Sequence, residues 1–324
     1  MSAVACNKMA SFGTNKALKR TWKQICLLGC LCLPVHSYAE QALCADEKDS
    51  EVCTPVNELQ ITVALGIGTT TNPLYQSENT PLYIVPDVAW YGENWYLDNT
   101  EIGYQWQNTD DFAMETFVSI NGERGNFSRG FATNVFLPEA SPGDSLTSDP
   151  LPSLPEVPAL DEDSNETVQF ATNIGVDDVA ERDWAIDAGV RFHWYKNDSE
   201  WSLSLLQDIS SVHKGQQAIV TYRHKYHLAD WMISPAFSLA WKSANLLDYY
   251  YGIDVRDGVS ENLFYDAKAG FFPSVRVSVR RRLNENWQWL IFGKYTHLDK
   301  GMTDSPLVEE SERMTFFTGV TYRF

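Results

Sequence analysis

The feature that most constrains this chain is an alternation of apolar and polar residues that recurs from residue 59 to the end. Two examples are the apolar sets Leu59, Ile61, Val63, Leu65, Ile67 and Val275, Val277, Val279, each separated by small or polar residues. Side chains of a strand alternate between two faces. Such segments fit strands of about 9–11 residues with lipid on one face and a wet lumen on the other. The pattern predicts an all-β fold, a transmembrane antiparallel up-and-down β-barrel.

Twelve strands are predicted, with ten as the alternative count. Their ranges are 59–68, 81–91, 94–106, 111–121, 126–137, 183–195, 199–209, 215–227, 230–242, 271–282, 286–298 and 312–324. Pro86 interrupts the second of these. An even count places both chain ends in the periplasm, as bacterial barrels prefer.

The last predicted strand ends on an aromatic carboxy terminus. Phe316, Val320, Tyr322 and Phe324 fall on one face, and Arg313 and other polar residues on the opposite face. This arrangement is typical of the closing strand of an outer-membrane barrel, and we interpret it as the signal read by the barrel-assembly machinery. The alternative is an ordinary amphipathic strand that ends the protein.

The amino terminus has the pattern of a secretory signal. Basic residues precede an apolar run from Ile25 to Val35, which is followed by Ser37-Tyr38-Ala39. The run is shorter than the roughly 20 apolar residues of a spanning helix. We expect residues 1–39 to be removed by cleavage after Ala39, leaving 40–58 as a periplasmic segment and 59–324 as the barrel. This predicts export to the outer membrane.

Cys44 and Cys53 are the two cysteines that follow the predicted cleavage site, and we expect a small disulfide loop between them. The net charge of the whole chain is −18. The segment 1–39 contains basic and no acidic residues, so the exported part is more acidic still. This sign disfavours nucleic acid as a partner.

Short polar connections are predicted at 91–94, 121–125, 196–199, 227–230 and 283–286. Trp95, Trp201, Trp231 and Trp287 follow four of them. Tryptophan settles at the level of lipid headgroups, so we interpret these residues as a periplasmic aromatic girdle in contact with outer-membrane lipid. Longer loops would lie at the other end, including an acidic, Pro-rich extracellular loop at about 138–182.

Several segments together resemble the MipA/OmpV family of outer-membrane proteins. They are Asn72-Pro73-Leu74-Tyr75, Trp90-Tyr91-Gly92-x-x-Trp95, His213-Lys214-Gly215, Asp248-Tyr249-Tyr250-Tyr251-Gly252, Asp304-Ser305-Pro306-Leu307-Val308 and Thr321-Tyr322-Arg323-Phe324. The resemblance implies a non-enzymatic barrel that scaffolds murein-remodelling enzymes, with a lytic transglycosylase and a murein synthase as partners. Other members of the family are linked to adhesion, osmotic response or antibiotic sensitivity.

Catalytic, cofactor and metal sites are not predicted. His213 lies beside Asp208, Ser210 and Ser211, but three residues of one short loop rarely adopt the geometry of a catalytic triad. His224 and His227 are three apart, which on a strand puts them on opposite faces.

The predicted lumen is charged. Inward positions include Glu101 and Glu115 early in the barrel and, late in the barrel, Arg223, Lys225, Arg276, Arg280, Arg282, Arg313 and Arg323. We therefore expect either pairing across a narrow lumen or separate hydration of each charge. Two functions remain open, a structural scaffold and a small-solute channel, with an adhesin as a further alternative.

Overall fold

A computed structural model describes residues 57–127 and 173–324. The predicted signal segment, the cleavage site after Ala39, the pair Cys44 and Cys53, and positions 138–172 of the acidic loop lie outside these residues.

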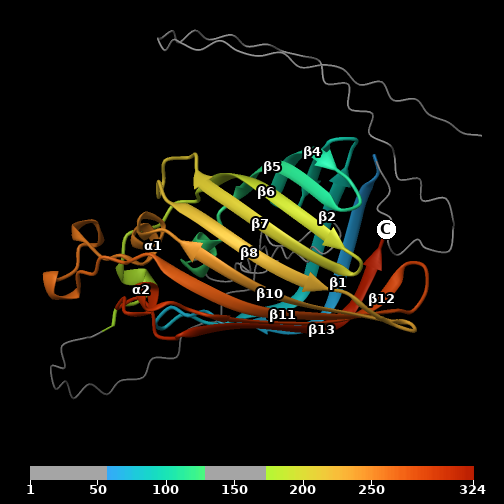
Figure 1. The fold of residues 1–324 in the computed structure, drawn as a ribbon. Coiled ribbons are helices and arrows are strands. Elements are labelled where there is room, and N and C mark those ends of the chain that lie inside the picture. The colour runs from blue at the N-terminus through green and yellow to red at the C-terminus, as the bar shows by residue number, and fades with distance from the viewer. Residues whose placement is uncertain (1–56, 128–172) are drawn as a thin grey trace, which may run out of the picture. The chain divides into compact units, whose positions relative to one another are not determined.

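The described residues form mostly strands (Figure 1). The strands are β1 (Leu59–Thr70), β2 (Thr80–Tyr91), β3 (Trp95–Asp98), β4 (Glu101–Asn108), β5 (Phe112–Ile120), β6 (Ile186–Lys196), β7 (Ser199–Asp208), β8 (Gln216–His224), β9 (Tyr226–Leu228), β10 (Trp231–Lys242), β11 (Gly270–Arg282), β12 (Trp287–His297) and β13 (Glu312–Arg323). Two α-helices, α1 (Ala244–Tyr251) and α2 (Lys300–Thr303), and four 3-10 turns, η1 (Gly122–Phe127), η2 (Val176–Asp178), η3 (Val255–Asp257) and η4 (Glu261–Leu263), lie between them. Within 57–127 and 173–324, no helix is long and apolar enough to cross a membrane.

The strands close into one antiparallel barrel. Apart from β8 and β9, strands that follow one another in the chain pair with each other, and β13 returns to pair with β1. Strands β8 and β9 follow one another along the same side of β10, so they occupy a single place in the wall. The described sheet therefore has twelve strand places. The predicted fold class and strand count are confirmed.

One predicted strand, 94–106, is in fact two. It consists of β3 and β4, which pair as a hairpin through the turn Asn99-Thr100. Asn99 has a positive φ of 51° and its side chain accepts from the N–H of Val88 at 2.9 Å. Asparagine tolerates this left-handed conformation and caps the adjacent edge of β2.

The predicted strand 126–137 is not the next strand of the wall. Its described positions, Asn126 and Phe127, belong to η1, and β5 pairs directly with β6. The segment 121–125 was predicted as a short turn. It instead opens the long connection between β5 and β6, at the same end of the barrel as its partners: Asn121 donates to Asp187 at the start of β6, and Asn126 donates to Tyr251 of α1. These two errors offset each other in the strand count.

Connections differ in length at the two ends of the barrel. At one end, which we call the turn end, they are 92–94, 109–111, 197–198, 229–230 and 283–286, together with the start of β1 and the end of β13. At the other, the loop end, they are 71–79, 209–215, 243–269 and 298–311, together with the described parts, 121–127 and 173–185, of the connection between β5 and β6. The length difference corresponds to the periplasmic and extracellular ends of bacterial barrels.

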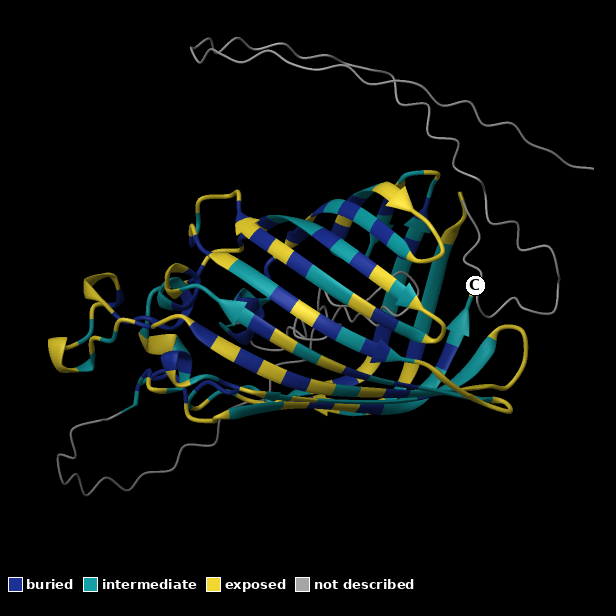
Figure 2. Cartoon of the chain, viewed as in Figure 1, coloured by how far each residue is buried: buried dark blue, intermediate teal, exposed yellow. Residues whose placement is uncertain are grey.

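Exposed and buried residues alternate along the strands (Figure 2). On β11 the exposed positions Phe271, Val275 and Val277 alternate with the buried Phe272, Ser274 and Ser278. The exposed face is the apolar one, as expected for a wall in contact with lipid.

Strand β2 is continuous through Pro86. Its pairing with β3 covers only Ala89–Tyr91, although the N–H and C=O of Val88 also bond to Asn99. Backbone groups two residues apart on a strand point to the same side, so the ring nitrogen of Pro86 points, like the N–H of Val88, away from β1. Proline is tolerated there because no ladder bond in the described residues requires its missing N–H.

The loops of the loop end pack into a buried apolar cluster, which we call the loop-end cap. It contains Leu74, Ile174, Leu246, Leu247, Tyr250, Tyr251, Ile253, Leu298, Met302 and Leu307. The same cluster continues into the barrel through the inward residues Phe117, Leu206, Ile219 and Phe272. The cap is therefore part of the packed interior of the barrel.

Candidate functional site

Helix α1 is the centre of the loop-end cap. Leu246, Leu247, Tyr250 and Tyr251 lie at spacings that place them on one face, and each is fully buried at 0% exposure. Gly215 lets this face approach closely, because a Cβ atom at that position would lie 2.6 Å from the backbone nitrogen of Leu246. The sequence His213-Lys214-Gly215 is thus explained by the close packing of the helix.

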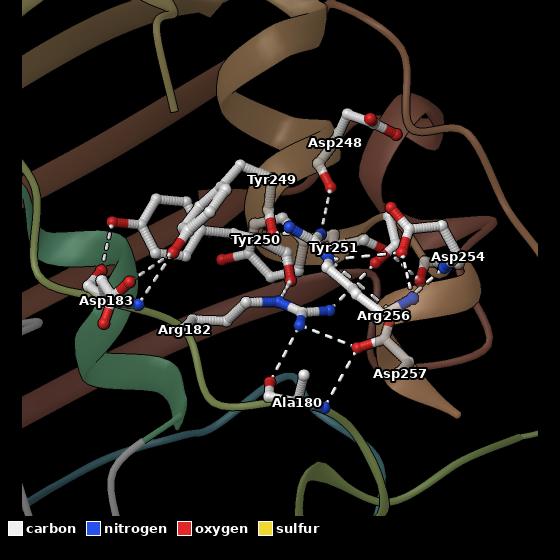
Figure 3. Close-up of polar contacts among 12 residues, drawn as sticks. Ala180, Arg182, Asp183, Asp248, Tyr249, Tyr250, Tyr251, Asp254, Arg256 and Asp257 are labelled. Carbon is white, nitrogen blue, oxygen red and sulfur yellow. Dashed lines mark hydrogen bonds and ion pairs between the residues drawn. The ribbon is translucent and has the colours of Figure 1, made fainter. Parts of the chain in front are cut away.

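Arg182 connects three segments of the cap (Figure 3). Its side chain is 1% exposed and forms an ion pair of 2.8 Å with Asp257 of η3. The guanidinium also donates to the backbone oxygens of Ala180, Tyr250 and Gly252. Burial raises the pKa of Asp257, but the hydrogen bond and charge of Arg182 outweigh this and lower it below the usual range.

Glu123 of η1 joins the cap to the barrel wall. Its carboxylate accepts from the ammonium of Lys242, the last residue of β10, and from the hydroxyl of Tyr251 on α1. Asn126 donates to the same hydroxyl at 2.7 Å. Burial raises the pKa of Glu123, but the charges of Lys242 and Arg313 lower it to about 2. The carboxylate therefore stays ionised and holds η1, α1 and β10 together.

Asp187, Asp208 and His213 lie together beneath the cap, with potential ligand atoms within 4.8 Å of one another. His213 Nδ1 accepts from the N–H of Gly215, so the ring proton is on Nε2, which lies 3.1 Å from Asp187. The other oxygen of Asp187 accepts from Asn121 at 2.7 Å.

Asp208 is fully engaged by local donors. One oxygen accepts from the N–H and hydroxyl of Ser210, and the other accepts from the N–H groups of His213 and Lys214. A carboxylate has about four lone-pair directions, so these four bonds leave none for a metal ion. Ser210 bonds to Asp208 and to the N–H of Ile186 instead of the His213 ring. The cluster is therefore arranged to hold the turn 209–215.

A second buried group of charges lies inside the barrel wall and is centred on Arg191 of β6. Its guanidinium binds Glu101 of β4 through two bonds of 2.9 and 2.8 Å, and Glu115 of β5 through one of 2.7 Å. The same guanidinium packs over the ring of Phe117 at 4.1 Å, and its Nε donates to Ser204. These ion pairs join β6 to the two strands that precede it in the wall, β5 and β4.

His193 extends this group along the wall. Its Nδ1 lies 2.8 Å from Glu200 and its Nε2 lies 3.4 Å from Glu115. Arg223 of β8 lies 3.7 Å from Glu200. We call the six residues Glu101, Glu115, Arg191, His193, Glu200 and Arg223 the lumen ion network; all of them are buried.

A small cavity lies between the cap and the barrel interior. Its volume is about 70 Å³, and the charged residues that line it include Glu123, Asp187, Lys242, Lys294 and Arg313. That volume suffices for a few water molecules, each needing about 10–15 Å³ by the same measure.

Comparison with known proteins agrees with this architecture. The family model described as MltA-interacting protein MipA matches residues 65–324. The chain belongs to the MipA family. It is 21% identical over 266 residues to the putative outer membrane protein YiaT of Escherichia coli K12, a match that covers 82% of this chain and 91% of YiaT.

Other MipA-family relatives match shorter stretches. The outer membrane protein Omp26La of Vibrio anguillarum is 25% identical over 164 residues, covering 51% of this chain and 61% of Omp26La. The MltA-interacting protein of E. coli K12 is 26% identical over 106 residues, covering 32% of this chain and 43% of that protein. Together with the barrel, these relatives place the chain in the outer membrane.

Among solved structures, the NanC porin is similar to this chain with a TM-score of 0.38 and 9% identity, covering 82% of this chain and 99% of NanC. A score at this level says nothing about ligands. The assignment as a barrel therefore stands on the strand pairing and on the MipA family.

Most segments that carry the family resemblance meet in the cap. Leu74 forms a β-bridge with Val308, and the N–H of Tyr75 donates to the carbonyl of Leu307. The hydroxyl of Ser305 donates to the carbonyl of Tyr251 at 2.6 Å. Segments far apart in the sequence are thus joined at one place, which makes the cap the candidate functional site of this MipA-family barrel.

The tryptophans of the predicted girdle lie at the turn end. Trp95, Trp231 and Trp287 each begin a strand, and Trp201 is the third residue of β7. Trp95 and Trp201 are 58% and 51% exposed. Their contact with lipid stays a prediction.

The predicted assembly signal lies on β13 and the residue after it. Phe316, Val320 and Tyr322 alternate with the buried Phe317 and Thr321, and Phe324 follows the strand. They therefore face outward, and their role in assembly stays a prediction.

Sequence reasoning did not identify Arg182, Glu123 and Asp257 as structural residues, because their partners are distant in the chain. Arg191 could have been placed in the lumen from its alternation with Val190 and Phe192. The identity of its partners, Glu101 and Glu115, depends on which strands are neighbours.

Proposed function

We propose that this protein is a non-enzymatic scaffold of the outer membrane, a barrel that is closed to bulk solute and presents surfaces to partner proteins. The observation that carries the proposal is the loop-end cap, whose apolar core continues into the barrel. The lumen ion network supports it, since Arg191 is 4% exposed and bound to two glutamates. A porin needs a hydrated path at this depth.

The partners that we propose are murein-remodelling enzymes, a lytic transglycosylase and a murein synthase. Support comes from the MipA family, which is described by the name MltA-interacting protein. The turn end, with its short connections and the exposed Trp95 and Trp201, would face the periplasm, where such enzymes work.

A pull-down with the folded barrel tests the scaffold. Immobilised protein, with its fold verified by heat-dependent gel mobility, should retain both murein enzymes from a periplasmic extract. Retention should survive disruption of the cap by Arg182→Met, because the cap lies at the opposite end. Failure to retain either enzyme would contradict the proposed partners, and loss of retention with the cap variant would contradict the proposed face.

A small-solute channel is the second candidate, and one observation favours it. The cavity of about 70 Å³ beneath the cap is lined by both acidic and basic side chains. Swelling of proteoliposomes separates the two candidates. Entry of small sugars that depends on solute size would favour the channel, and swelling no faster than that of protein-free liposomes favours the closed scaffold.

A further inference from the structure

Three residues of neighbouring strands form a row at the turn end. Trp231 of β10 pairs in register with Arg281 of β11, and Arg281 pairs with Trp289 of β12. The guanidinium of Arg281 lies 5.2 Å from the centre of the Trp231 ring, and the two indoles are 5.5 Å apart. The three residues thus share one face of the wall: Arg281 packs on Trp231, and Trp289 contacts the same indole.

This row lies on the outward face. The inward residues of β11, such as Ser274 and Ser278, are buried, whereas Arg281 is exposed. The other outward residues of β11 are Phe271, Pro273, Val275, Val277 and Val279. Arg281 therefore ends an otherwise apolar face, one residue before the end of the strand, at the level where a barrel wall meets lipid headgroups.

Arg281 differs from the buried arginines in its contacts. Arg191 and Arg182 are each bonded to carboxylates. Within residues 57–127 and 173–324, the contact that the guanidinium of Arg281 makes is with the ring of Trp231. Its N–H donors are consequently available to a ligand outside the protein.

We propose that Arg281, in register with Trp231 and Trp289 and packed on the former, binds the phosphate of an anionic phospholipid in the leaflet at the turn end. The planar guanidinium can bind two phosphate oxygens at once, and the contact with Trp231 orients it. The indoles supply amphipathic surface for the glycerol backbone and the upper acyl chain. An anionic headgroup is favoured because it has no ammonium of its own to neutralise the phosphate.

Native mass spectrometry of the full protein tests the site. The protein is incubated in mixed micelles with phosphatidylglycerol or with phosphatidylethanolamine, and the retained lipid is counted. We expect the wild type to retain phosphatidylglycerol preferentially and Arg281→Gln to retain about tenfold less, since one charged hydrogen-bonded contact accounts for roughly that factor. Arg281→Lys should fall between them and lose lipid more readily in salt, because lysine binds as a point charge.

Lys196 provides the matched control. It is a second exposed cation at the turn end, on β6, so Lys196→Gln changes the net charge equally. We expect its lipid retention to equal that of the wild type. Heat-dependent gel mobility verifies that each variant is a folded barrel.

Three outcomes would overturn the proposal. Equal retention of phosphatidylglycerol by Arg281→Gln and the wild type would remove Arg281 from the site. An equal loss in Lys196→Gln would reduce the effect to general attraction between charges. Displacement of the lipid by an equimolar amount of inorganic phosphate would indicate a site for free phosphate. The proposal does not depend on the scaffold function.

Discussion

The two ends of the barrel are stabilised by contacts of different range in the sequence. At the turn end, connections of two to four residues join neighbouring strands, and the polar-then-aromatic pattern of each hairpin is local. At the loop end, segments from four connections meet in one cap, and its buried bonds join residues as distant as Glu123 and Tyr251. Local sequence therefore determines the structure of the turn end, and contacts between residues distant in the sequence determine the structure of the loop end.

This difference predicts where the molecule is vulnerable. Each turn at the turn end is supported by the ladder of the two strands that it joins. The cap depends on a few buried polar residues, and removing one of them leaves its buried partner without one of its bonds. The loop end should therefore lose its structure while the barrel stays intact.

The largest effect is expected for Arg182→Met. This change removes the shortest ion pair of the buried Asp257 and leaves it the longer contact of 3.8 Å with Arg256. Breaking a buried pair in this way should destabilise the cap by about 3 kcal/mol. Limited proteolysis should cut 243–269 rapidly, whereas heat-dependent gel mobility should still report a folded barrel. Arg256→Gln is the comparison in the same cap. Its guanidinium is partly exposed, and its contacts with Asp254 and Asp257, at 3.6 and 3.8 Å, are longer than that of Arg182, so their loss should cost less.

The double variant Arg182→Met, Asp257→Leu sharpens this test. Replacing both partners by apolar residues removes the buried charge of Asp257 and should restore part of the lost stability. If Arg182→Met is no more sensitive to protease than Arg256→Gln, the ion pair does not hold the cap.

Acid should open the cap through Glu123. Its pKa is lowered from 4.5 to about 2 in the folded cap, so its ionised form contributes stability above pH 4.5. That contribution, up to about 3 kcal/mol, is lost as the pH falls from 4.5 to 2. Proteolysis of the cap by an acid protease should therefore accelerate in this window.

Glu123→Gln provides the comparison for the acid prediction. It should weaken the cap at neutral pH and flatten the dependence between pH 4.5 and 2. An unchanged pH profile in this variant would assign the effect to other groups, such as Asp257, whose pKa is also lowered.

A smaller effect is expected for Tyr251→Phe. The hydroxyl bonds to Glu123 and Asn126, and its removal leaves both without that contact at a cost of about 1–3 kcal/mol. Protease sensitivity of the cap should lie between those of Arg182→Met and the wild type. Tyr249→Phe, whose hydroxyl bonds to the exposed Asp183, should change the cap less.

The turn within the wall should depend on Asn99. Asn99→Ala removes the bond to Val88 and places alanine at a φ of 51°, which should cost about 1–2 kcal/mol. Asn99→Gly keeps the backbone conformation and should cost less. Urea unfolding of the reconstituted barrel measures the loss of stability in both variants. An equal loss would show that the side-chain bond of Asn99, and not its backbone angle, stabilises the turn.

The smallest effect is expected at the turn end. Trp201→Leu keeps an apolar outward residue and should change the unfolding free energy by less than about 1 kcal/mol. A loss of stability as large as that of Arg182→Met would contradict the proposed difference between the two ends.

The sequence predicts the barrel well because outward and inward residues alternate with the same period everywhere. The prediction failed where that period changes phase. Trp95 and Leu97 face outward at odd positions, and Ile102 and Tyr104 face outward at even positions. This shift across Asn99-Thr100 indicates a tight turn. The alternation alone does not reveal it, because the segments before and after the turn alternate equally well.

The candidate site was less accessible to prediction. Arg182 and Asp257 are 75 residues apart, and polar residues in long loops are usually solvated. Glu123 was assigned to a short turn, yet it is buried between Lys242 and Tyr251. Their pairing depends on how the loops fold over the barrel, which periodicity does not encode.

Amide hydrogen exchange of α1 in the reconstituted protein tests the central claim most directly. If the loop-end cap is a packed part of the barrel interior, the amides of Leu247 to Tyr251 should exchange slowly, on the timescale of the strand β10 that precedes them. Exchange of these amides at the rate of an unstructured peptide would contradict the account.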